Sequence, residues 1–397
     1  MIIEIILALF IGLICGIITG LTPGIHINLI SAFIISLTLL TKLKPETLIV
    51  FLVSMSITHT FLDSIPSIFL GAPDSDHALS VLPGHKLLLQ QKGYEAVLLT
   101  IIGSFSAILI SICFIPLIYL ILNNFYSVIQ KFIPFFLIST LVFLILNERK
   151  NKITAFFISL LAGSLGLTTL SLNIEQILFP LFSGLFGIST LVISLKQKIK
   201  IPKQKITFPK IKLKKYIKTI FSGFIASLLV GTMPGLGSAQ GAAIVESVNK
   251  KINNKYYLIL TGSLNTFVMV ISFVTLYTIG KARNGTVIAI SKLVENYSKI
   301  YFIYSLITIL AIAGIATILA INISKIFSKI IFKINYKKLL ISIILLITIL
   351  TVYLTNFIGL IVLLTSSFLG IYVNLKGIAR SHLMSVLIIP VIFYFLI

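Results

Sequence analysis

The amino-acid sequence predicts an all-α, polytopic membrane protein built from two inverted repeats, each a re-entrant broken hairpin followed by five transmembrane helices. Three observations lead to this prediction. The 397 residues are 58% hydrophobic and only 11% charged, whereas soluble domains are about 45–50% apolar and about 25% charged. The apolar residues form runs of about 17–25 residues, the length that spans a bilayer. The order of these runs occurs twice, each time with a Pro-Gly break in the first member.

The charge of the chain fits a membrane protein and not a nucleic-acid partner. The formal net charge is +22, but Lys and Arg lie in short segments between apolar runs, as the positive-inside rule describes for cytoplasmic loops. Such segments also contact anionic lipid headgroups. Cys15 and Cys113 lie inside apolar runs without Cys-x-x-Cys spacing, which argues against a metal site. The N-terminus lacks a basic region and a cleavage site, so we expect a true membrane segment in a multi-pass protein of the cell membrane.

The first repeat is expected at residues 1–195. It opens with a hairpin of about residues 2–41, in which the apolar runs Ile2–Leu21 and Ile27–Leu40 flank a tip at Pro23-Gly24. A break of this kind ends a helix because Pro and Gly interrupt it. Five spans are expected to follow, beginning near Thr47, Ala96, Phe132, Ile153 and Ile177. A basic cytoplasmic linker then occupies residues 196–218.

The second repeat is expected at residues 219–397 and has the same order. Its hairpin covers about residues 219–249, with a tip at Pro234-Gly235. Each half of this hairpin has only about 14 residues, whereas a membrane span needs about 20, so we expect a re-entrant hairpin. The first hairpin is assigned by analogy with the second. Five further spans are expected to begin near Tyr257, Ile300, Leu339, Phe357 and Met384.

The basic loops predict that the second repeat is inverted relative to the first. If all four basic loops face the cytoplasm, the number of membrane spans between consecutive loops must be even. The number is even when each hairpin is counted as a re-entrant segment that does not cross the membrane. Five spans per repeat is an odd number, so the orientations of the repeats are opposite, as in many secondary transporters. Lys42 and Lys44 fall on the outer side and are an exception to the overall bias. The four loops are residues 147–152, 196–218, 323–338 and 374–380.

The two hairpin tips share the frame Gly-x-x-Pro-Gly, in Gly20–Gly24 and Gly231–Gly235. Pro ends a helix and Gly permits the turn, so the next helix begins with free N–H groups that suit an anion. The alternative is a proline kink with glycine packing, which is common in membrane helices. The binding-site hypothesis assigns an anionic substrate to Thr22, Pro23, Gly24, His26, Asn28, Pro234, Gly235, Gly237, Ser238 and Gln240.

A cluster of acidic and histidine residues follows the first hairpin, in a chain with only ten acidic residues. Ionisable groups at membrane depth are costly and usually functional, so His59, Asp63, Asp74 and Asp76 are candidates for ion coupling. His59 and Asp63 are four residues apart and share a helix face. Asp63 could bind a cation, relay a proton or pair with His59, whereas Asp74 and Asp76 could lie in a hydrated loop. A metal site lacks any standard ligand spacing.

The equivalent region of the second repeat carries Asn265, followed by Lys281 and Arg283. Asn265 is a further candidate for substrate binding. Arg283 could bind a carboxylate or phosphate through two hydrogen bonds, or it could be a loop cation.

Several further motifs occur along roughly the first 285 residues. They are Gly-x-x-Pro-Gly-x-x-x-Asn at Gly20–Asn28, Ile65-Pro66, Gly71-Ala72-Pro73, Leu82–Leu87, Gln91–Ala96, Ile102–Phe105 and Val230–Ser238. Together they resemble the large permease subunit of the tripartite tricarboxylate transporters, the TctA family. The resemblance implies a secondary transporter of carboxylates, assisted by a small membrane subunit and an extracytoplasmic binding protein. It also implies that Gly71 and Pro73 line the substrate site together with the hairpin residues.

The leading hypothesis is therefore cation- or proton-coupled transport of a small organic anion of the di/tricarboxylate class. The repeats would rock around a site between the two tips, with Na+ or H+ as the coupling ion and no cofactor. The alternative is a translocase of a polyprenyl-phosphate-type lipid carrier, since helix N-termini suit phosphate equally well. No nucleophile, zinc or P-loop motif is present, so we expect no enzymatic activity. Membrane lipids are expected partners, and the oligomeric state, a homo-oligomer included, is open at this point.

Overall fold

The computed structural model describes residues 2–22, 44–70, 81–148, 150–174, 176–196, 201–232, 237–249, 252–294, 296–333 and 335–396. These residues form helices and connecting segments, and no strand occurs among them. Eight continuous helical segments among the described residues are long and apolar enough to cross a membrane. The prediction of an all-α, polytopic membrane protein is therefore confirmed.

The described helices lie on both sides of the basic segment 201–212. In the first half they are α1 (Ile2–Leu21), α3 (Pro45–Leu62), α4 (Ser64–Phe69), α5 (Val81–Leu89), α6 (Gly93–Leu146), α7 (Lys152–Ser171), α8 (Leu178–Phe182), the π-helix η2 (Ser183–Ile188) and α9 (Ser189–Lys196). In the second half they are α10 (Leu213–Thr232), α11 (Ser238–Val248), α12 (Asn254–Ile279), α13 (Gly285–Leu293), α14 (Lys299–Ile330), η3 (Ile331–Lys333), α15 (Tyr336–Lys376), η4 (Arg380–Met384) and α16 (Ser385–Leu396).

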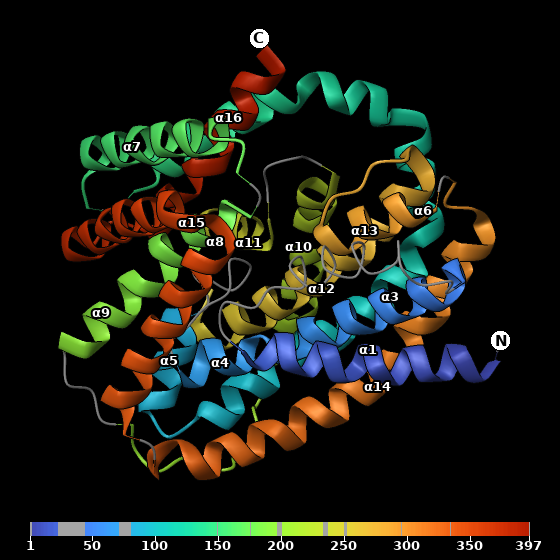
Figure 1. The fold of residues 1–397 in the computed structure, drawn as a ribbon, viewed down its shortest axis with the longest axis horizontal. Coiled ribbons are helices and arrows are strands. Elements are labelled where there is room, and N and C mark those ends of the chain that lie inside the picture. The colour runs from blue at the N-terminus through green and yellow to red at the C-terminus, as the bar shows by residue number, and fades with distance from the viewer. Residues whose placement is uncertain are drawn as a thin grey trace.

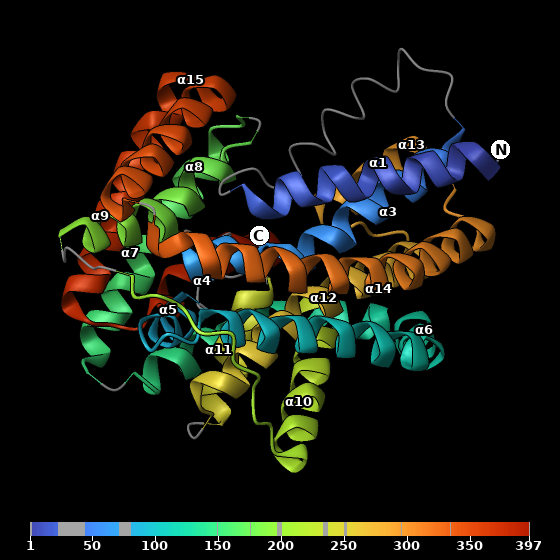
Figure 2. The same ribbon diagram turned by 90° about the horizontal axis from the view of Figure 1, so that it is seen from below.

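Two of the long helices, α3 and α12, lie at the centre of the molecule. In each, 94% of the most apolar stretch is buried, compared with 28% for α1, α6 and α15. Figures 1 and 2 show α1, α3 and α14 running side by side, and α12 packs between α10 and α6. Outward-facing helices such as α1 keep apolar side chains on their exposed face, which is the surface that a bilayer covers. Functional polar groups are therefore expected on α3 and α12, which are shielded from lipid.

Two long helices each cover two of the expected spans. The 54 residues of α6 would extend about 80 Å if straight, far more than the hydrocarbon thickness of about 30 Å. The helix instead curves through an arc, seen in teal in Figure 1, and contains Pro116 and Pro134. In α15 the break is sharper, because Asn356 has φ 54° and ψ −157° inside the helix. This break lies one residue before Phe357, where a new span is expected.

The two predicted hairpins lie only partly within the described residues. Helix α1 ends at Leu21, just before the first predicted tip, and the described part of α10 extends to Thr232. Helix α10 has 20 residues and is longer than expected, because the basic residues of Leu213–Lys218 are already helical. The tips at Pro23-Gly24 and Pro234-Gly235, and the second half of the first hairpin, lie outside the described residues.

Glycine allows the central helices to approach each other closely. A Cβ atom added to Gly16 of α1 would lie 2.6 Å from the carbonyl oxygen of Met55 in α3. Between α6 and α12 the contact is reciprocal: a Cβ atom at Gly103 would meet Ile259 O at 2.2 Å, and one at Gly262 would meet Thr100 O at 2.3 Å. Small residues permit such contacts between membrane helices, where packing rather than a hydrophobic driving force holds helices together.

Replacing Gly103 with alanine should therefore destabilise the protein, although alanine is the better helix former. The new methyl group overlaps a backbone carbonyl that cannot rotate away, and overpacking of this kind costs about 1–3 kcal/mol. Thermal unfolding of purified Gly103→Ala in detergent should show a lower midpoint than the wild type. Gly314→Ala is the matched control, since nothing lies within 4 Å of a Cβ atom there. Equal midpoints for the two variants would contradict this account of the packing.

Candidate functional site

The centre of the candidate site is the side chain of Asp63, at the junction of α3 and α4. This residue is 3% exposed. Its Oδ2 atom accepts a hydrogen bond of 2.6 Å from Asn265 Nδ2 on α12 and lies 3.8 Å from His59 Nε2, one turn earlier on α3. A buried carboxyl group must have such partners, because an unpaired one at this depth is costly. The structure thus brings together three residues that the sequence assigned to two different repeats.

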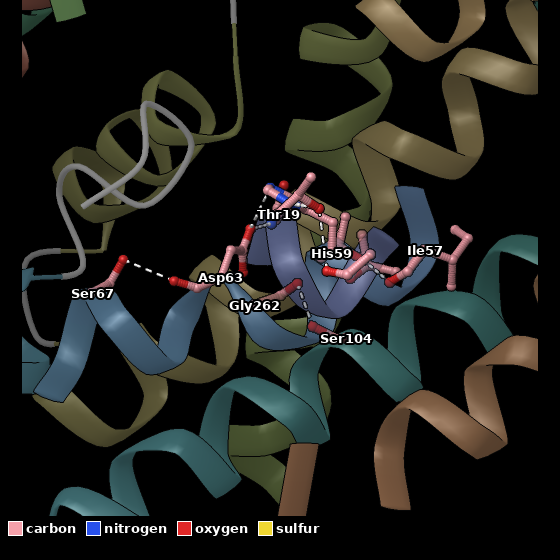
Figure 3. A network of polar contacts seen from close by, with 11 residues as sticks. Thr19, Ile57, His59, Asp63, Ser67, Ser104 and Gly262 are labelled. Carbon is pink, nitrogen blue, oxygen red and sulfur yellow. Dashed lines mark hydrogen bonds and ion pairs between the residues drawn. The ribbon is translucent and has the colours of Figure 1, made fainter. Parts of the chain in front are cut away.

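The other ring nitrogen of His59 extends this group to the first hairpin. His59 Nδ1 and Thr19 Oγ1 are hydrogen-bonded at 3.1 Å, and Thr19 lies in the last turn of α1. Figure 3 shows the side chains of Thr19, His59 and Asp63 gathered between these helices. The result is one polar chain, Thr19–His59–Asp63–Asn265, which we call the central network. It connects the end of α1 to α3 and α12.

Further hydroxyl groups hold the helices around the central network. The hydroxyl groups of Ser64 and Thr100 are 2.8 Å apart, and Ser104 Oγ donates to Gly262 O at 3.0 Å. Ser67 Oγ donates to the backbone carbonyl of Asp63 at 3.1 Å; both of these last two contacts are drawn in Figure 3. These contacts fix α4 and α6 beside α3 and α12, so the side chains of the central network have little freedom to move apart.

The start of α11 forms a second polar group, in the second hairpin. Gln240 Oε1 accepts a hydrogen bond of 2.7 Å from the backbone N–H group of Gly237, and Gln240 Nε2 donates to Met384 Sδ at 3.2 Å. Ser238 is 2% exposed and is the first residue of the helix. This end of α11 carries the positive end of the helix dipole.

Arg283 lies at the end of α10, the other half of the second hairpin. Its Nη2 atom donates to the backbone carbonyl of Thr232, the last residue of α10, and to Tyr126 Oη at 2.9 Å. A cation at this end also compensates the negative end of the helix dipole. Arg283 therefore belongs to a group separate from the central network. Its hydrogen bond to Thr232 stabilises this end of α10.

An apolar cavity of about 380 Å³ lies next to Thr232. It is formed by the curved middle of α6 and the last turn of α10. The lining residues are Ile118, Ile121, Leu122, Phe125, Val128, Ile129, Phe132, Phe136, Leu228, Leu229 and Thr232.

The remaining predicted site residues have different outcomes. Thr22 is half-buried and its N–H group donates to Ile18 O, so it continues the last turn of α1. The residues that lie outside the described part are Pro23, Gly24, His26, Asn28, Gly71, Pro73, Asp74, Asp76, Pro234 and Gly235. Within the described part, no three His, Cys, Asp or Glu side chains gather as they would around a metal ion.

Sequence reasoning did not find Thr19, Thr60 or Thr266, although all three are buried at the central network. Thr60 and Thr266 join α3 to α12 through hydroxyl groups 3.4 Å apart. A threonine in an apolar run is common because its hydroxyl group can bond to the preceding turn. Their positions in the sequence could have indicated them. Thr19 lies in the last turn before the Pro-Gly break, and Thr60 and Thr266 each directly follow a candidate site residue.

A second buried ionisable group joins two loops that were predicted to be cytoplasmic. Glu148, after α6, accepts hydrogen bonds from Ala379 N and from His382 Nε2, both at 3.0 Å. Burial acts to raise the pKa of Glu148, but the hydrogen bonds from Lys150, Ala379 and His382 outweigh it and hold the pKa below its ordinary value. Burial lowers the pKa of His382, against the opposing effect of Glu148. These contacts are the kind that two loops on one side of a membrane can make.

Acidification should weaken this junction. Because the pKa of His382 is lower in the folded protein than its ordinary value of 6.5, its contribution to stability is complete above about pH 6.5 and is lost as the pH falls below that value. Glu148 adds a loss at still lower pH, since its pKa is also held down. Thermal unfolding at pH 7.5 and 5.5 should show a larger decrease in midpoint for the wild type than for His382→Gln. The same decrease in both proteins would contradict a role for His382.

Long apolar helices packed around a buried acid–imidazole network define a multi-pass membrane protein. The chain matches the family model described as the "Tripartite tricarboxylate transporter TctA family" over residues 6–385. It therefore belongs to the TctA family, and the resemblance noted in the sequence is confirmed. This is a transporter family, whose members are large subunits of tripartite transporters, so a solute and partner proteins are implied.

One relative covers nearly the whole chain. It is an uncharacterized protein of Methanocaldococcus jannaschii, 35% identical over 403 residues that span 98% of this chain and 99% of the relative. No solved structure matches the chain.

Proposed function

We propose that the protein is a secondary transporter of a small organic anion of the di/tricarboxylate class, driven by coupled movement of protons. The family supports a tricarboxylate transporter-type permease in general terms. The observation that carries the finer proposal is the central network, in which Asp63 and His59 are buried together and linked to Asn265 on α12. Buried ionisable groups of this kind mark ion and proton pathways in membrane proteins.

Matching contacts in the two halves support the proposal of two related repeats. In α1, Gly12 and Gly20 would each contact α3 if they carried a Cβ atom, at Ser54 and Leu62. In α10, Gly223 and Gly231 would contact α12 at Ser263 and Ile271. The two glycines of each helix are eight residues apart, and so are the two residues that they would contact. The helix before each Pro-Gly break therefore packs on the next long helix in the same register.

Contacts between loops support the inverted orientation of the repeats. Glu95 at the start of α6 accepts a hydrogen bond from Thr207 of the linker and pairs with Lys255 at the start of α12 at 2.6 Å. The topology derived from the basic loops places all three residues at the cytoplasmic side. The Glu148–His382 junction likewise joins two segments predicted on that side.

In this proposal the central network couples proton binding to movement of the repeats. Carboxyl and imidazole groups are the side-chain types that carry protons in such pathways, and the Asn265 amide presents an N–H donor rather than an oxygen ligand to Asp63 Oδ2. A proton on Asp63 weakens that charge-assisted hydrogen bond and so loosens α3 from α12. Anion binding at the hairpin tips, where α11 presents its N-terminus, would favour one arrangement of the repeats. The cycle needs no cofactor and no enzymatic step.

The hydrogen bond between Asn265 and Asp63 should matter for folding as well as transport. Asn265→Leu removes the donor and leaves the Asp63 side chain buried without it, which should cost about 2–3 kcal/mol. The neighbouring Thr266→Val removes only a 3.4 Å hydroxyl contact and should cost about 1 kcal/mol or less. Thermal or denaturant unfolding of the two variants compares them directly, and a larger loss for Thr266→Val would argue against the network.

Transport by reconstituted protein tests the function itself. Vesicles that contain the wild type should accumulate labelled di- or tricarboxylate when a proton gradient is imposed. Asp63→Asn should lose gradient-driven accumulation while still exchanging internal for external anion, because a coupling residue is needed only for the driven cycle. Glu46→Gln, on the same helix, is the matched control and should accumulate substrate normally.

Three results would change this proposal. Absence of uptake of every carboxylate in folded, reconstituted protein would reject the substrate class. Accumulation driven by sodium alone would replace the proton with Na+. Full gradient-driven uptake by Asp63→Asn would remove the central network from the coupling mechanism.

A second candidate function is translocation of a polyprenyl-phosphate-type lipid carrier. The apolar cavity beside the end of α10 favours it, because a lipid chain could enter there next to the second hairpin. Movement of a labelled polyprenyl phosphate across vesicles, without carboxylate uptake, would support this function over the first.

The tripartite character of the family also supports partner subunits. We expect this chain to work with a small membrane subunit and an extracytoplasmic binding protein, and a second copy of the chain is compatible with its extensive apolar surface.

A further inference from the structure

The apolar cavity beside α10 opens toward the side of the molecule that a bilayer covers. Its α6 residues recur at helical spacing along one face of the curved segment 118–136. Phe125 and Phe132 line it and are 57% and 61% exposed, so its outer wall belongs to the apolar surface of the protein. Its volume, about 380 Å³, is within the range of about 300–1,000 Å³ that ligand sites occupy. A component of the membrane can reach this cavity from the side.

Two cations lie close to this cavity. Lys281 Nζ lies 4.9 Å from the centre of the Tyr126 ring and 3.4 Å from Gln130 Oε1, both on the curved segment of α6. Arg283 contacts the same tyrosine and the carbonyl of Thr232, which itself lines the cavity. Lys281 is exposed and Arg283 is partly exposed, so both can be approached from outside.

The partners of these cations are all neutral. In the described part of the chain, Lys281 and Arg283 contact an aromatic ring, a phenol, an amide and a backbone carbonyl, but no carboxylate. The Nε atom of Arg283 is buried and has no hydrogen-bond partner there. Positive charge that has no carboxylate partner beside a membrane attracts an anion. An apolar cavity next to two such cations has the chemistry of an anionic amphiphile.

We propose that an anionic phospholipid binds here, with one acyl chain in the cavity and its phosphate at Lys281 and Arg283. The apolar lining excludes the headgroup from the cavity, and the two cations select negative charge at its edge. A small di- or tricarboxylate would leave the cavity unfilled, so the site differs from the substrate site. Because Arg283 also donates a hydrogen bond to Thr232 of α10, bound lipid would stabilise this end of α10.

Native mass spectrometry of the full chain, equilibrated with phosphatidylglycerol or phosphatidylcholine, tests this site. The wild type should retain one phosphatidylglycerol molecule in preference to phosphatidylcholine. Lys281→Ala should lower this retention about fivefold or more, since it removes one of two charges that hold the phosphate. Lys292→Ala, an exposed lysine on the neighbouring helix α13, is the matched control and should retain lipid as the wild type does.

A variant that fills the cavity separates binding of the lipid acyl chain from binding of the phosphate. Val128 is 52% exposed, so Val128→Trp should fold and fill part of the cavity while leaving both cations in place. It should also lose retained phosphatidylglycerol, and its thermal unfolding, compared with the wild type in lipid-free detergent, shows whether it is folded.

Several results would overturn the proposal. Equal retention of the two lipids by the wild type would remove the charge selectivity, and unchanged retention by Lys281→Ala would remove this cation from the site. Wild-type retention by folded Val128→Trp would exclude the cavity as the chain site. Complete competition by glycerol phosphate would point to a headgroup site alone, and transfer of labelled lipid between leaflets by the wild type would make the lipid cargo rather than a bound ligand.

Discussion

The hydrogen bond between Asp63 and Asn265 constrains the rest of the structure, because it fixes α3 against α12 at the centre of the molecule. In hydrocarbon a polar side chain without a partner is costly, so the two helices must stay in the register that keeps this pair together. His59 lies four residues before Asp63 on the same helix, and Thr19 joins this group only if α1 lies against α3. A single buried pair thus links the packing of three helices to the chemistry of the site.

Glycine allows α6 to pack closely on α12 beside this pair. At Gly103 and Gly262 the backbones of α6 and α12 approach so closely that a methyl group on either would collide with a carbonyl oxygen. Close approach brings Ser104 within hydrogen-bond distance of Gly262 O and Ser64 within reach of Thr100. Membrane helices gain little from apolar burial against lipid, and they associate through tight packing and interhelical hydrogen bonds. The polar network and the glycine contacts are therefore two parts of the same arrangement.

Much of the fold could be predicted because apolar length and Pro-Gly breaks are local signals. Helix α1 ends just before the first Pro-Gly break, and the break at Asn356 lies one residue before a span expected from apolar length. The continuity of α6 could not be predicted, since proline in a membrane helix can either end it or bend it, and neighbouring helices decide which. The pairing of Asp63 with Asn265 also lay beyond sequence patterns: the residues are 202 positions apart, and only the packing of α3 on α12 joins them.

The ends of the two hairpins are held by groups of opposite chemistry, and this asymmetry suits the proposed function. The end of α1 is tied through Thr19 and His59 to an acid, whereas the end of α10 is tied to the cation Arg283. In the proposed function the proton binds at the first group and the substrate anion binds at the N-terminus of α11, so the two ligands of a proton–anion carrier would not compete for one site. Since α3 and α12 connect these ends through Asp63 and Asn265, a proton that loosens this link changes how both hairpins are held. Coupling then needs no direct contact between proton and anion, only a shared pair of helices that responds to both.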